Sequence, residues 1–337
     1  MKRERADRQT DPATDPPADG AEPLLAPFPY LGGKRAVAAQ VWAAALGDPA
    51  HYIEPFAGSL AVLLQRPPST RAKAETVNDA SGMIVNIWRS IKHDPEGVLR
   101  ATLGPVHEAD YHARHRESVA RREYSAERLR LDPRWHDAEL AGWDVWGLSI
   151  QIGADWMRER PLGARPRSDA RGAGITRFSE AEARLVLQAL ARRLARVDTL
   201  CGDWLRCCSS KSALRGPILD LKSGSVGVFL DPPYTPSALK GRECLYGAET
   251  TLAADVRAWC LEWGATSWLR VVLAGVEGEH DALIEAGWRV ERWAAGGSFA
   301  QGGFSNTSGK RERRKEALWL SPHCLAPVND AQAALFP

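Results

Sequence analysis

Short apolar runs alternate with amphipathic segments near the start of the chain. Residues 51–54 and 75–79 are strand-like runs, and each is followed by a segment with helical spacing, at 60–65 and 83–92. Residues 37–46 have helical spacing as well. This order of strand, turn and helix is typical of a parallel sheet covered by helices. The pattern therefore predicts an α/β fold.

The same rhythm returns after about residue 181. There the pattern predicts helices over 182–197, 253–264 and 282–286, strands over 227–230 and 269–274, and a closing antiparallel pair over 288–293 and 316–320. The two regions with this rhythm, 27–98 and 181–325, are predicted to form one domain.

The stretch from 99 to 180 interrupts the rhythm and is predicted to be a mostly helical insertion. Residues 114–130 form a charged helix in which Glu117 and Arg121 are spaced for an ion pair, typical of a solvated surface. Residues 141–148 are apolar and aromatic, which favours internal packing over a base-stacking surface. Residues 160–177, rich in Gly, Pro and Arg, are predicted to be a long loop.

Composition narrows the class of protein. Residues 1–26 are rich in Pro, Asp and Ala without apolar periodicity, which predicts a disordered leader. No apolar run is long enough to span a membrane and no signal core is present, so we expect a cytoplasmic protein. The six cysteines show neither zinc-binding spacing nor a partner histidine cluster, so no metal is expected. A net charge of +2 neither requires nor excludes a nucleic-acid partner.

The sharpest chemical signal is the tetrapeptide Asp231-Pro232-Pro233-Tyr234, which directly follows four apolar residues. Its alternative is an ordinary proline turn. An exocyclic aromatic amine is a poor nucleophile, because its lone pair is delocalised into the ring. The Asp231 carboxylate and the Pro232 carbonyl can each accept one amino hydrogen and direct the lone pair toward a methyl donor. Proline adds no competing backbone donor, and Tyr234 can stack on a base that has left the duplex.

Three upstream segments suit a methyl-donor site. Residues 54–58 (Glu-Pro-Phe-Ala-Gly) follow the first strand, where glycine permits close approach of a ligand to the backbone. Asp79 ends the second strand, where related folds place an acid on ribose hydroxyls; a helix N-cap is the alternative. Lys34, after Gly32-Gly33, can pair with the donor's carboxylate or be a solvated lysine.

The order of these motifs resembles the Dam-like family of DNA N6-adenine methyltransferases, in the α-group arrangement. The resemblance rests on Pro29 to Lys34, Ile53 to Gly58, Asn78-Asp79 with residues 84–92, and Asp231 to Tyr234. It implies a Rossmann-like methyltransferase sheet and S-adenosylmethionine as the cofactor. It also implies that 99–180 is a target-recognition region. Tyr30 stands where many relatives have tryptophan, and 99–180 aligns with nothing recognisable.

The chemistry of the residues and the family resemblance together predict a cofactor site and a catalytic pocket. The cofactor-binding residues are predicted to be Tyr30, Gly33, Lys34, Glu54, Phe56, Gly58, Asp79, Asp203 and Asp231, and the catalytic residues Asp231, Pro232, Pro233 and Tyr234. Asp203 resembles a family position near the cofactor's adenine, with a surface turn as the alternative.

Double-stranded DNA is the expected partner. Residues 295–309 are rich in Gly and Ser, and the run that follows supplies the predicted phosphate contacts Lys310, Arg311, Arg313 and Arg314. A solvated basic loop is the alternative. We expect a monomer, with a homodimer as the alternative. No nuclease-like carboxylate cluster stands out, so a solitary or phage-type modification enzyme is expected.

Other functions stay open at this point. Transfer to N4 of cytosine or to adenine in RNA uses the same chemistry. Asp rather than Asn at 231 argues against methylation of protein amides. A decayed DNA-binding regulator is disfavoured by the intact motif residues, and a small-molecule methyltransferase would leave the insertion unexplained.

Overall fold

The structure is a computed structural model that describes residues 24–30, 32–67, 74–104, 106–151, 155–159, 162, 174–215, 225–234, 251–294 and 315–326. Its strands are β1 (His51–Glu54), β2 (Ala74–Asp79), β3 (Val197–Cys201), β4 (Val226–Leu230), β5 (Leu269–Val276), β6 (Arg289–Ala294) and β7 (Lys315–Leu320). Its helices are α1 (Arg35–Val41), α2 (Gly82–His93), α3 (Pro95–Thr102), α4 (Glu108–Leu131), α5 (Ala138–Ile150), α6 (Glu180–Leu194), α7 (Lys211–Arg215), α8 (Leu252–Trp263) and α9 (Ala282–Glu285). Shorter helical turns lie at Trp42–Leu46, Leu63–Gln65, Asp155–Met157, Ile175–Arg177 and Trp204–Arg206.

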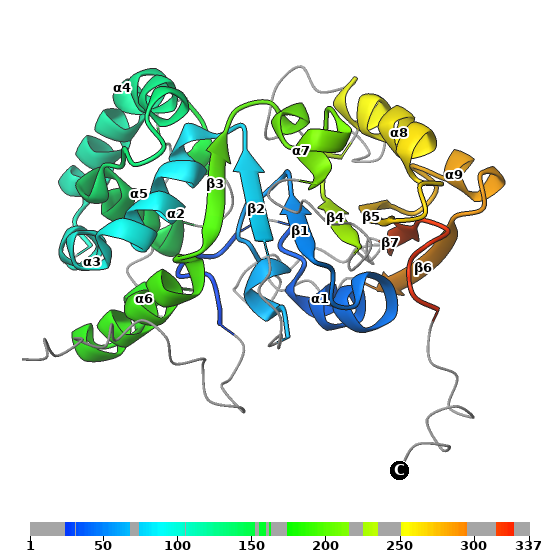
Figure 1. The fold of residues 1–337 in the computed structure, drawn as a ribbon. Coiled ribbons are helices and arrows are strands. Elements are labelled where there is room, and N and C mark those ends of the chain that lie inside the picture. Colours follow the sequence, from blue (N-terminus) through cyan, green and yellow to red (C-terminus); the bar gives the residue numbers. More distant parts are fainter. Residues whose placement is uncertain are drawn as a thin grey trace, which may run out of the picture.

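The strands form one mixed sheet. Within the described residues it has seven strands, in the order β3-β2-β1-β4-β5-β7-β6 (Figure 1). The first five are parallel, whereas β7 runs antiparallel to both β5 and β6. This arrangement confirms the predicted Rossmann-like sheet and its closing antiparallel pair. The strand order reverses between β1 and β4, and ligands of open α/β sheets bind at such a switch point, beyond the carboxyl ends of the strands.

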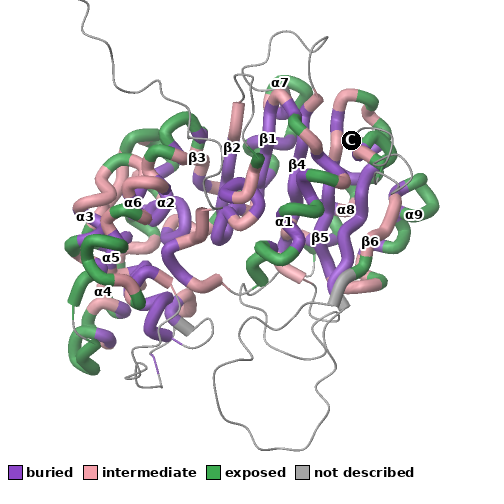
Figure 2. Tube along the Cα trace, turned by 90° about the horizontal axis from the view of Figure 1, so that it is seen from below, coloured by how far each residue is buried: buried purple, intermediate pink, exposed green. Residues whose placement is uncertain are grey.

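The sheet is covered on both faces. Neighbouring residues of β1 point to opposite sides: Tyr52 packs in one apolar cluster and Ile53 in another. The first cluster includes residues of α1, α2 and α6, and the second includes residues of α8. Figure 2 shows that the central strands β1, β4 and β5 are buried along most of their length. Both faces of a parallel strand need such cover, which is why β4 reads as a continuous apolar run.

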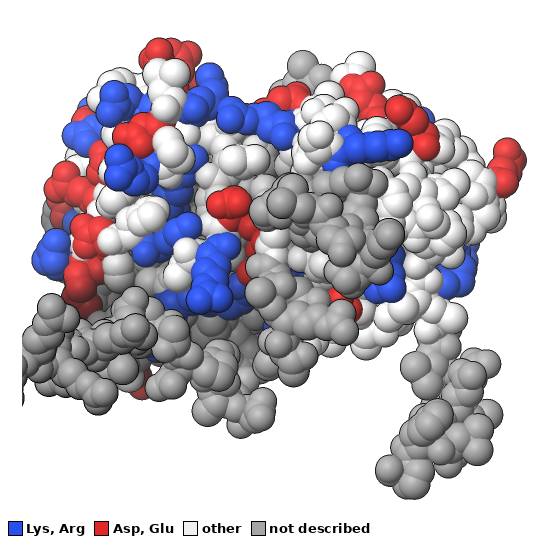
Figure 3. Space-filling view, viewed as in Figure 1, with Lys and Arg blue, Asp and Glu red and all other residues white. Residues whose placement is uncertain are grey.

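The predicted insertion is helical in the residues that the structure describes. Helices α3, α4 and α5 lie beside the β3 edge of the sheet (Figure 1). Residues 141–148 fall in α5, where Trp146 is buried, as expected of a packing segment. On α4, Arg121 Nε lies 2.6 Å from Glu117 Oε1, which confirms the predicted ion pair. Figure 3 shows basic and acidic side chains interspersed over this part of the surface.

Two local predictions were wrong, and one strand was missed. Residues 60–65 contain only a 3₁₀ turn, Leu63–Gln65, because the backbone at Leu60 has a φ of +52°, which an α-helix does not allow. The helix predicted over 182–197 ends at Leu194. Strand β3 follows it and was missed, because its exposed Asp198 hides the apolar pattern of a strand at the sheet edge.

Parts of the predicted leader, the loop 160–177 and the Gly-rich segment 295–309 lie outside the described residues. Leu24 and Ala26, at the end of the predicted leader, pack against the core. None of the helices described in the structure is long and apolar enough to cross a membrane.

Candidate active site

Four of the predicted site residues lie where the parallel strands of the sheet end. Glu54 ends β1, Asp79 ends β2, and Asp231 directly follows β4. Parallel strands bring their carboxyl ends to the same edge, so three segments that are distant in sequence converge there. Lys34 reaches this edge from the loop before α1 and forms an ion pair with Asp231.

The Lys34–Asp231 ion pair is the centre of the site. Lys34 Nζ lies 2.9 Å from Asp231 Oδ1, with side chains 3% and 21% exposed. The same ammonium donates a hydrogen bond to the Gly32 carbonyl at 2.7 Å and lies 5.2 Å from the centre of the Tyr234 ring. Two residues of the tetrapeptide, Asp231 and Tyr234, therefore lie close to the buried Lys34 cation.

Charge and burial compete in this pair. Burial raises the pKa of Asp231, while the Lys34 ammonium lowers it, and the net shift is upward. For Lys34, burial disfavours the charged form, but Asp231, Tyr234 and Glu316 outweigh it and raise its pKa. The lysine is thus held as a cation, and its charge limits how far burial can neutralise Asp231.

Glu316 is a member of the site that the sequence did not reveal. It lies on β7, is buried, and its Oε2 is 3.9 Å from Lys34 Nζ. In the register of the sheet Glu316 is opposite Val276, at the carboxyl end of β5. Since β7 is antiparallel, its first residues reach the edge where the parallel strands end. The available signal was a carboxylate inside an apolar closing strand.

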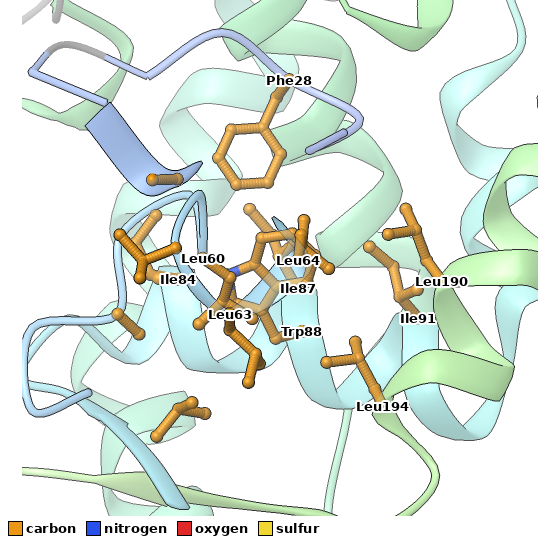
Figure 4. Packing of buried hydrophobic residues seen from close by; sticks show 14 of the residues in the cluster. Phe28, Leu60, Leu63, Leu64, Ile84, Ile87, Trp88, Ile91, Leu190 and Leu194 are labelled. Carbon is orange, nitrogen blue, oxygen red and sulfur yellow. The ribbon is translucent and has the colours of Figure 1, made fainter. Parts of the chain in front are cut away.

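Tyr30 packs on the turn that follows β1. Gly58 has a φ of +45°, and a Cβ there would lie 2.7 Å from the Tyr30 ring. The Gly58 carbonyl accepts a hydrogen bond of 2.8 Å from the Trp88 indole, which Figure 4 shows packed among Phe28 and Leu60. Glycine is therefore required at 58 both by the backbone conformation and by the aromatic ring.

Gly33 also lies close to this turn. A Cβ at Gly33 would approach Ser59 Oγ to 3.3 Å. The loop before α1 and the turn after β1 are thus in close contact, which holds Tyr30 and Lys34 at the sheet edge.

Asp79 holds the same turn from the neighbouring strand. Its carboxylate accepts hydrogen bonds from the backbone N–H groups of Gly58 at 2.9 Å and Ser81 at 2.8 Å. Burial raises the pKa of Asp79 to about 6, although these hydrogen bonds lower it. The N-cap of α2 is Ser81 and not Asp79, so the capping alternative for Asp79 is wrong.

Glu54 lies beneath the turn rather than on its surface. The Glu54 side chain is buried, and its Oε2 accepts from the Tyr52 hydroxyl at 2.9 Å and the Leu63 N–H at 3.3 Å. Burial raises the pKa of Glu54 to about 8, so at neutral pH the group is mostly protonated. These contacts support a role in shaping the turn.

The turn after β3 completes this side of the site. Phe56 stacks on Trp204 with ring centres 6.1 Å apart. Asp203 is exposed and accepts a hydrogen bond of 2.8 Å from the Leu205 N–H, which caps the short helical turn Trp204–Arg206. Asp203 therefore has the local role of a surface-turn residue and lies beside the Phe56 stack.

The predicted DNA contacts Lys310, Arg311, Arg313 and Arg314 lie outside the described residues. Within the described part of the chain, no group of three or more His, Cys, Asp or Glu side chains could hold a metal ion.

The mixed seven-stranded sheet of the described residues, with its flanking helices, is consistent with a Rossmann-like methyltransferase fold. The model of a protein family described as D12 class N6 adenine-specific DNA methyltransferase matches residues 30–130. This match confirms the resemblance to Dam-like enzymes and supports methylation of adenine in DNA. It covers Tyr30, Lys34, Glu54 and Asp79, whereas the tetrapeptide at Asp231 lies beyond it. No curated protein matches the chain.

Proposed function

We propose that the protein is a site-specific DNA methyltransferase that transfers a methyl group from S-adenosylmethionine to N6 of adenine. The observation that carries the proposal is the Asp231 carboxylate, held 2.9 Å from a buried lysine at the carboxyl edge of the sheet. The match to a family of adenine methyltransferases supports the choice of base and of DNA.

The residues at the switch point fit a nucleoside methyl donor. Asp79 supplies a carboxylate suited to ribose hydroxyls, and Tyr30 and Phe56 supply aromatic surface beside the glycine-containing turn. When bound, the donor supplies an electrophilic methyl group on a sulfonium. No residue in this set requires a metal.

The catalytic chemistry is proposed to depend on orientation. Asp231 and the Pro232 carbonyl each accept one hydrogen of the exocyclic amine, so that the nitrogen becomes tetrahedral and its lone pair is withdrawn from the ring π system and directed at the methyl group. The nitrogen–methyl bond would form as the methyl–sulfur bond breaks, and the proton that the methylated amine loses would pass to Asp231 or to water. Tyr234 stacks on the base, which leaves the duplex to reach the pocket. Pro233 restricts the backbone that presents these groups.

Lys34 is proposed to act on Asp231. Two of its three N–H groups have partners in the Gly32 carbonyl and the Asp231 carboxylate. These contacts favour a role in holding Asp231 ionised and oriented over the pairing with the donor's carboxylate that the sequence suggested. Without the Lys34 ammonium, the partly buried Asp231 carboxylate would have no counter-charge at this contact.

Duplex DNA is the proposed partner, contacted in part by residues 310–314, and a DNA substrate agrees with a cytoplasmic location. We propose a monomer. We propose that 99–180, which holds α4, α5 and the second half of α3, is a target-recognition region inserted between the two parts of the catalytic domain, 27–98 and 181–325.

The proposal is tested by transfer of labelled methyl groups from S-adenosylmethionine to three acceptors. Unmethylated duplex DNA of mixed sequence should be labelled, while a duplex of only dG and dC and an adenine-containing RNA should not. Label in the dG·dC duplex would indicate cytosine N4 as the target, and label in RNA alone would replace DNA as the substrate. Absence of label in all three, with duplex DNA still bound, would favour a DNA-binding regulator.

A further inference from the structure

Asn78 occupies a central place between the two turns that flank the proposed donor site. It is the penultimate residue of β2 and is 1% exposed. Its Nδ2 donates one hydrogen bond to the Pro55 carbonyl at 3.1 Å and another to the Gly202 carbonyl at 2.9 Å. One amide group therefore links the turn after β1 to the turn after β3.

The backbone around Asn78 makes the same two connections. The Ala57 N–H donates to the Asn78 carbonyl at 2.9 Å, and the Gly202 N–H donates to the Asp79 carbonyl at 2.9 Å. The end of β2 thus fixes both turns through main-chain and side-chain bonds, and the side-chain bonds all come from Asn78 and Asp79.

The orientation of the Asn78 amide follows from its surroundings. Two carbonyl oxygens face Nδ2, and an oxygen in that place would be repelled by both. Oδ1 consequently points the other way, where it is buried without a hydrogen-bond partner among the described residues. Leaving a buried acceptor unpaired costs free energy, so this site forgoes stability to keep two donors aimed at the two turns.

The spacing of the two turns determines the shape of the proposed pocket. Phe56 belongs to the first turn and stacks on Trp204, which directly follows the second, with ring centres 6.1 Å apart. The Tyr30 ring packs against Gly58 in the first turn. A change in the distance between Pro55 and Gly202 would separate the stacked rings and move the aromatic surface assigned to the donor.

We infer that Asn78 is a positioning residue for the methyl donor, which acts by bridging the Pro55 and Gly202 carbonyls and so fixing the aromatic walls of the donor pocket. The inference rests on the proposed function. Asn78 acts through the turns and does not take part in the transfer step, so its loss weakens donor binding and leaves the rate at saturating donor nearly intact.

Asn86 provides a matched control. It is also a fully buried asparagine, and its amide bridges α2 to Asp137: Nδ2 donates to the Asp137 carbonyl at 2.9 Å, and Oδ1 accepts from the Asp137 N–H at 2.8 Å. Its bonds are as extensive as those of Asn78, but they connect α2 to Asp137, the N-cap of α5, and neither of the two turns beside the proposed donor site. Asn86→Ala should therefore reduce stability without changing the donor pocket.

The test compares Asn78→Ala, Asn78→Ser and Asn86→Ala by the KM for S-adenosylmethionine, the kcat, the donor Kd from calorimetry and the melting temperature. We expect Asn78→Ala to raise the donor KM and Kd about tenfold or more, equivalent to about 1.4 kcal/mol, with kcat changed less than about threefold. Asn78→Ser keeps one side-chain donor and should be intermediate, and its milder change preserves the test if the alanine variant does not fold.

Unchanged donor KM and Kd in folded Asn78 variants, or an equal rise in Asn86→Ala, would overturn the inference. A wild-type protein that binds no S-adenosylmethionine would instead overturn the proposed function, so the two failures are distinguishable.

Discussion

The ammonium of Lys34, from the loop before α1, lies 2.9 Å from the carboxylate of Asp231, which follows β4. The contact joins the first and the last of the motifs that point to methyl transfer. Lys34 is buried and Asp231 is partly buried, so the contact matters for stability: an unpaired ammonium in this position would be strongly disfavoured. It also gives the lysine a defined influence on the protonation of the carboxylate.

Replacing Lys34 by methionine should move the acid limb of the activity profile to higher pH. Lys34 lowers the pKa of Asp231 while burial raises it, so removal of the cation raises that pKa further, and more alkaline conditions are needed to ionise the carboxylate. At neutral pH the loss of a preorganised charge is expected to reduce kcat roughly 100-fold. The measurement is kcat against pH.

Lys92→Met is the control for this prediction. Lys92 is partly buried, whereas Lys34 is buried, and it donates to the Val197 carbonyl at 2.9 Å, on the far side of β2 from Asp231. Its pH profile should match the wild type. An acid limb in Lys34→Met that stays at the wild-type pH would show that the lysine does not control Asp231.

Glu54 should make the folded protein less stable as the pH rises above neutral. Its pKa is raised from 4.5 to about 8 in the folded state, so the folded protein holds a proton that the unfolded chain has already released. The contribution of the Glu54 carboxyl to stability is therefore fully present below about pH 4.5, is lost as the pH rises to about 8, and does not change further above that pH. Between pH 7 and 9 the expected loss is about 1.4 kcal/mol.

Burial also raises the pKa values of the Asp79 and Asp144 carboxyls, to about 6. These two groups are mostly ionised above pH 7, so they contribute little to the change in stability between pH 7 and 9.

Urea unfolding at both pH values is the measurement. Glu54→Gln keeps an oxygen that can accept from Tyr52 and Leu63, and it should reduce the loss by about 1.4 kcal/mol. The loss that remains comes from buried thiols such as Cys208 and Cys260, whose pKa values burial raises. The same loss of stability in Glu54→Gln as in the wild type would contradict the assignment.

Gly58→Ala should weaken both the fold and the binding of the donor. The new Cβ would lie 2.7 Å from the Tyr30 ring in a backbone conformation with a φ of +45°. We expect a loss of about 2 kcal/mol in stability and a rise of roughly tenfold in the donor Kd, because Tyr30 must move.

Gly278→Ala separates these two effects. Gly278 also has a positive φ, +89°, but beyond its chain neighbours a Cβ there would meet none of the described atoms within 4 Å, so only the backbone cost applies. Calorimetric unfolding and donor titration of both variants give the comparison. Equal donor affinities in the two variants would argue against Tyr30 as part of the donor pocket.

Much of the site was predictable because its residues lie at the ends of strands. Glu54, Asp79 and Asp231 each end or follow an apolar run, and a parallel sheet necessarily aligns those ends. The sequence pattern therefore places them at the same end of the sheet, whereas their proximity depends on β2, β1 and β4 being neighbouring strands. The position of Lys34 was predicted only as a cofactor contact, and its pairing with Asp231 was not.

Two features depended on relations that no local pattern records. Glu316 reaches Lys34 because β7 inserts antiparallel between β5 and β6, and the strand order is not encoded near residue 316. Asn78 reads as an ordinary polar residue at a strand end, whereas its role depends on Gly202, which is distant in sequence. Such contacts follow from tertiary structure and not from periodicity.

The most direct test of the central claim is mass spectrometry of the nucleosides released from duplex DNA after incubation with S-adenosylmethionine and either the wild type or Asp231→Ala. We expect N6-methyl-2′-deoxyadenosine from the wild type and none from Asp231→Ala at a temperature where the variant is still folded, although its melting temperature falls because the buried Lys34 ammonium loses its partner. N4-methyl-2′-deoxycytidine, no methylated nucleoside from the wild type, or full activity of Asp231→Ala would contradict the claim.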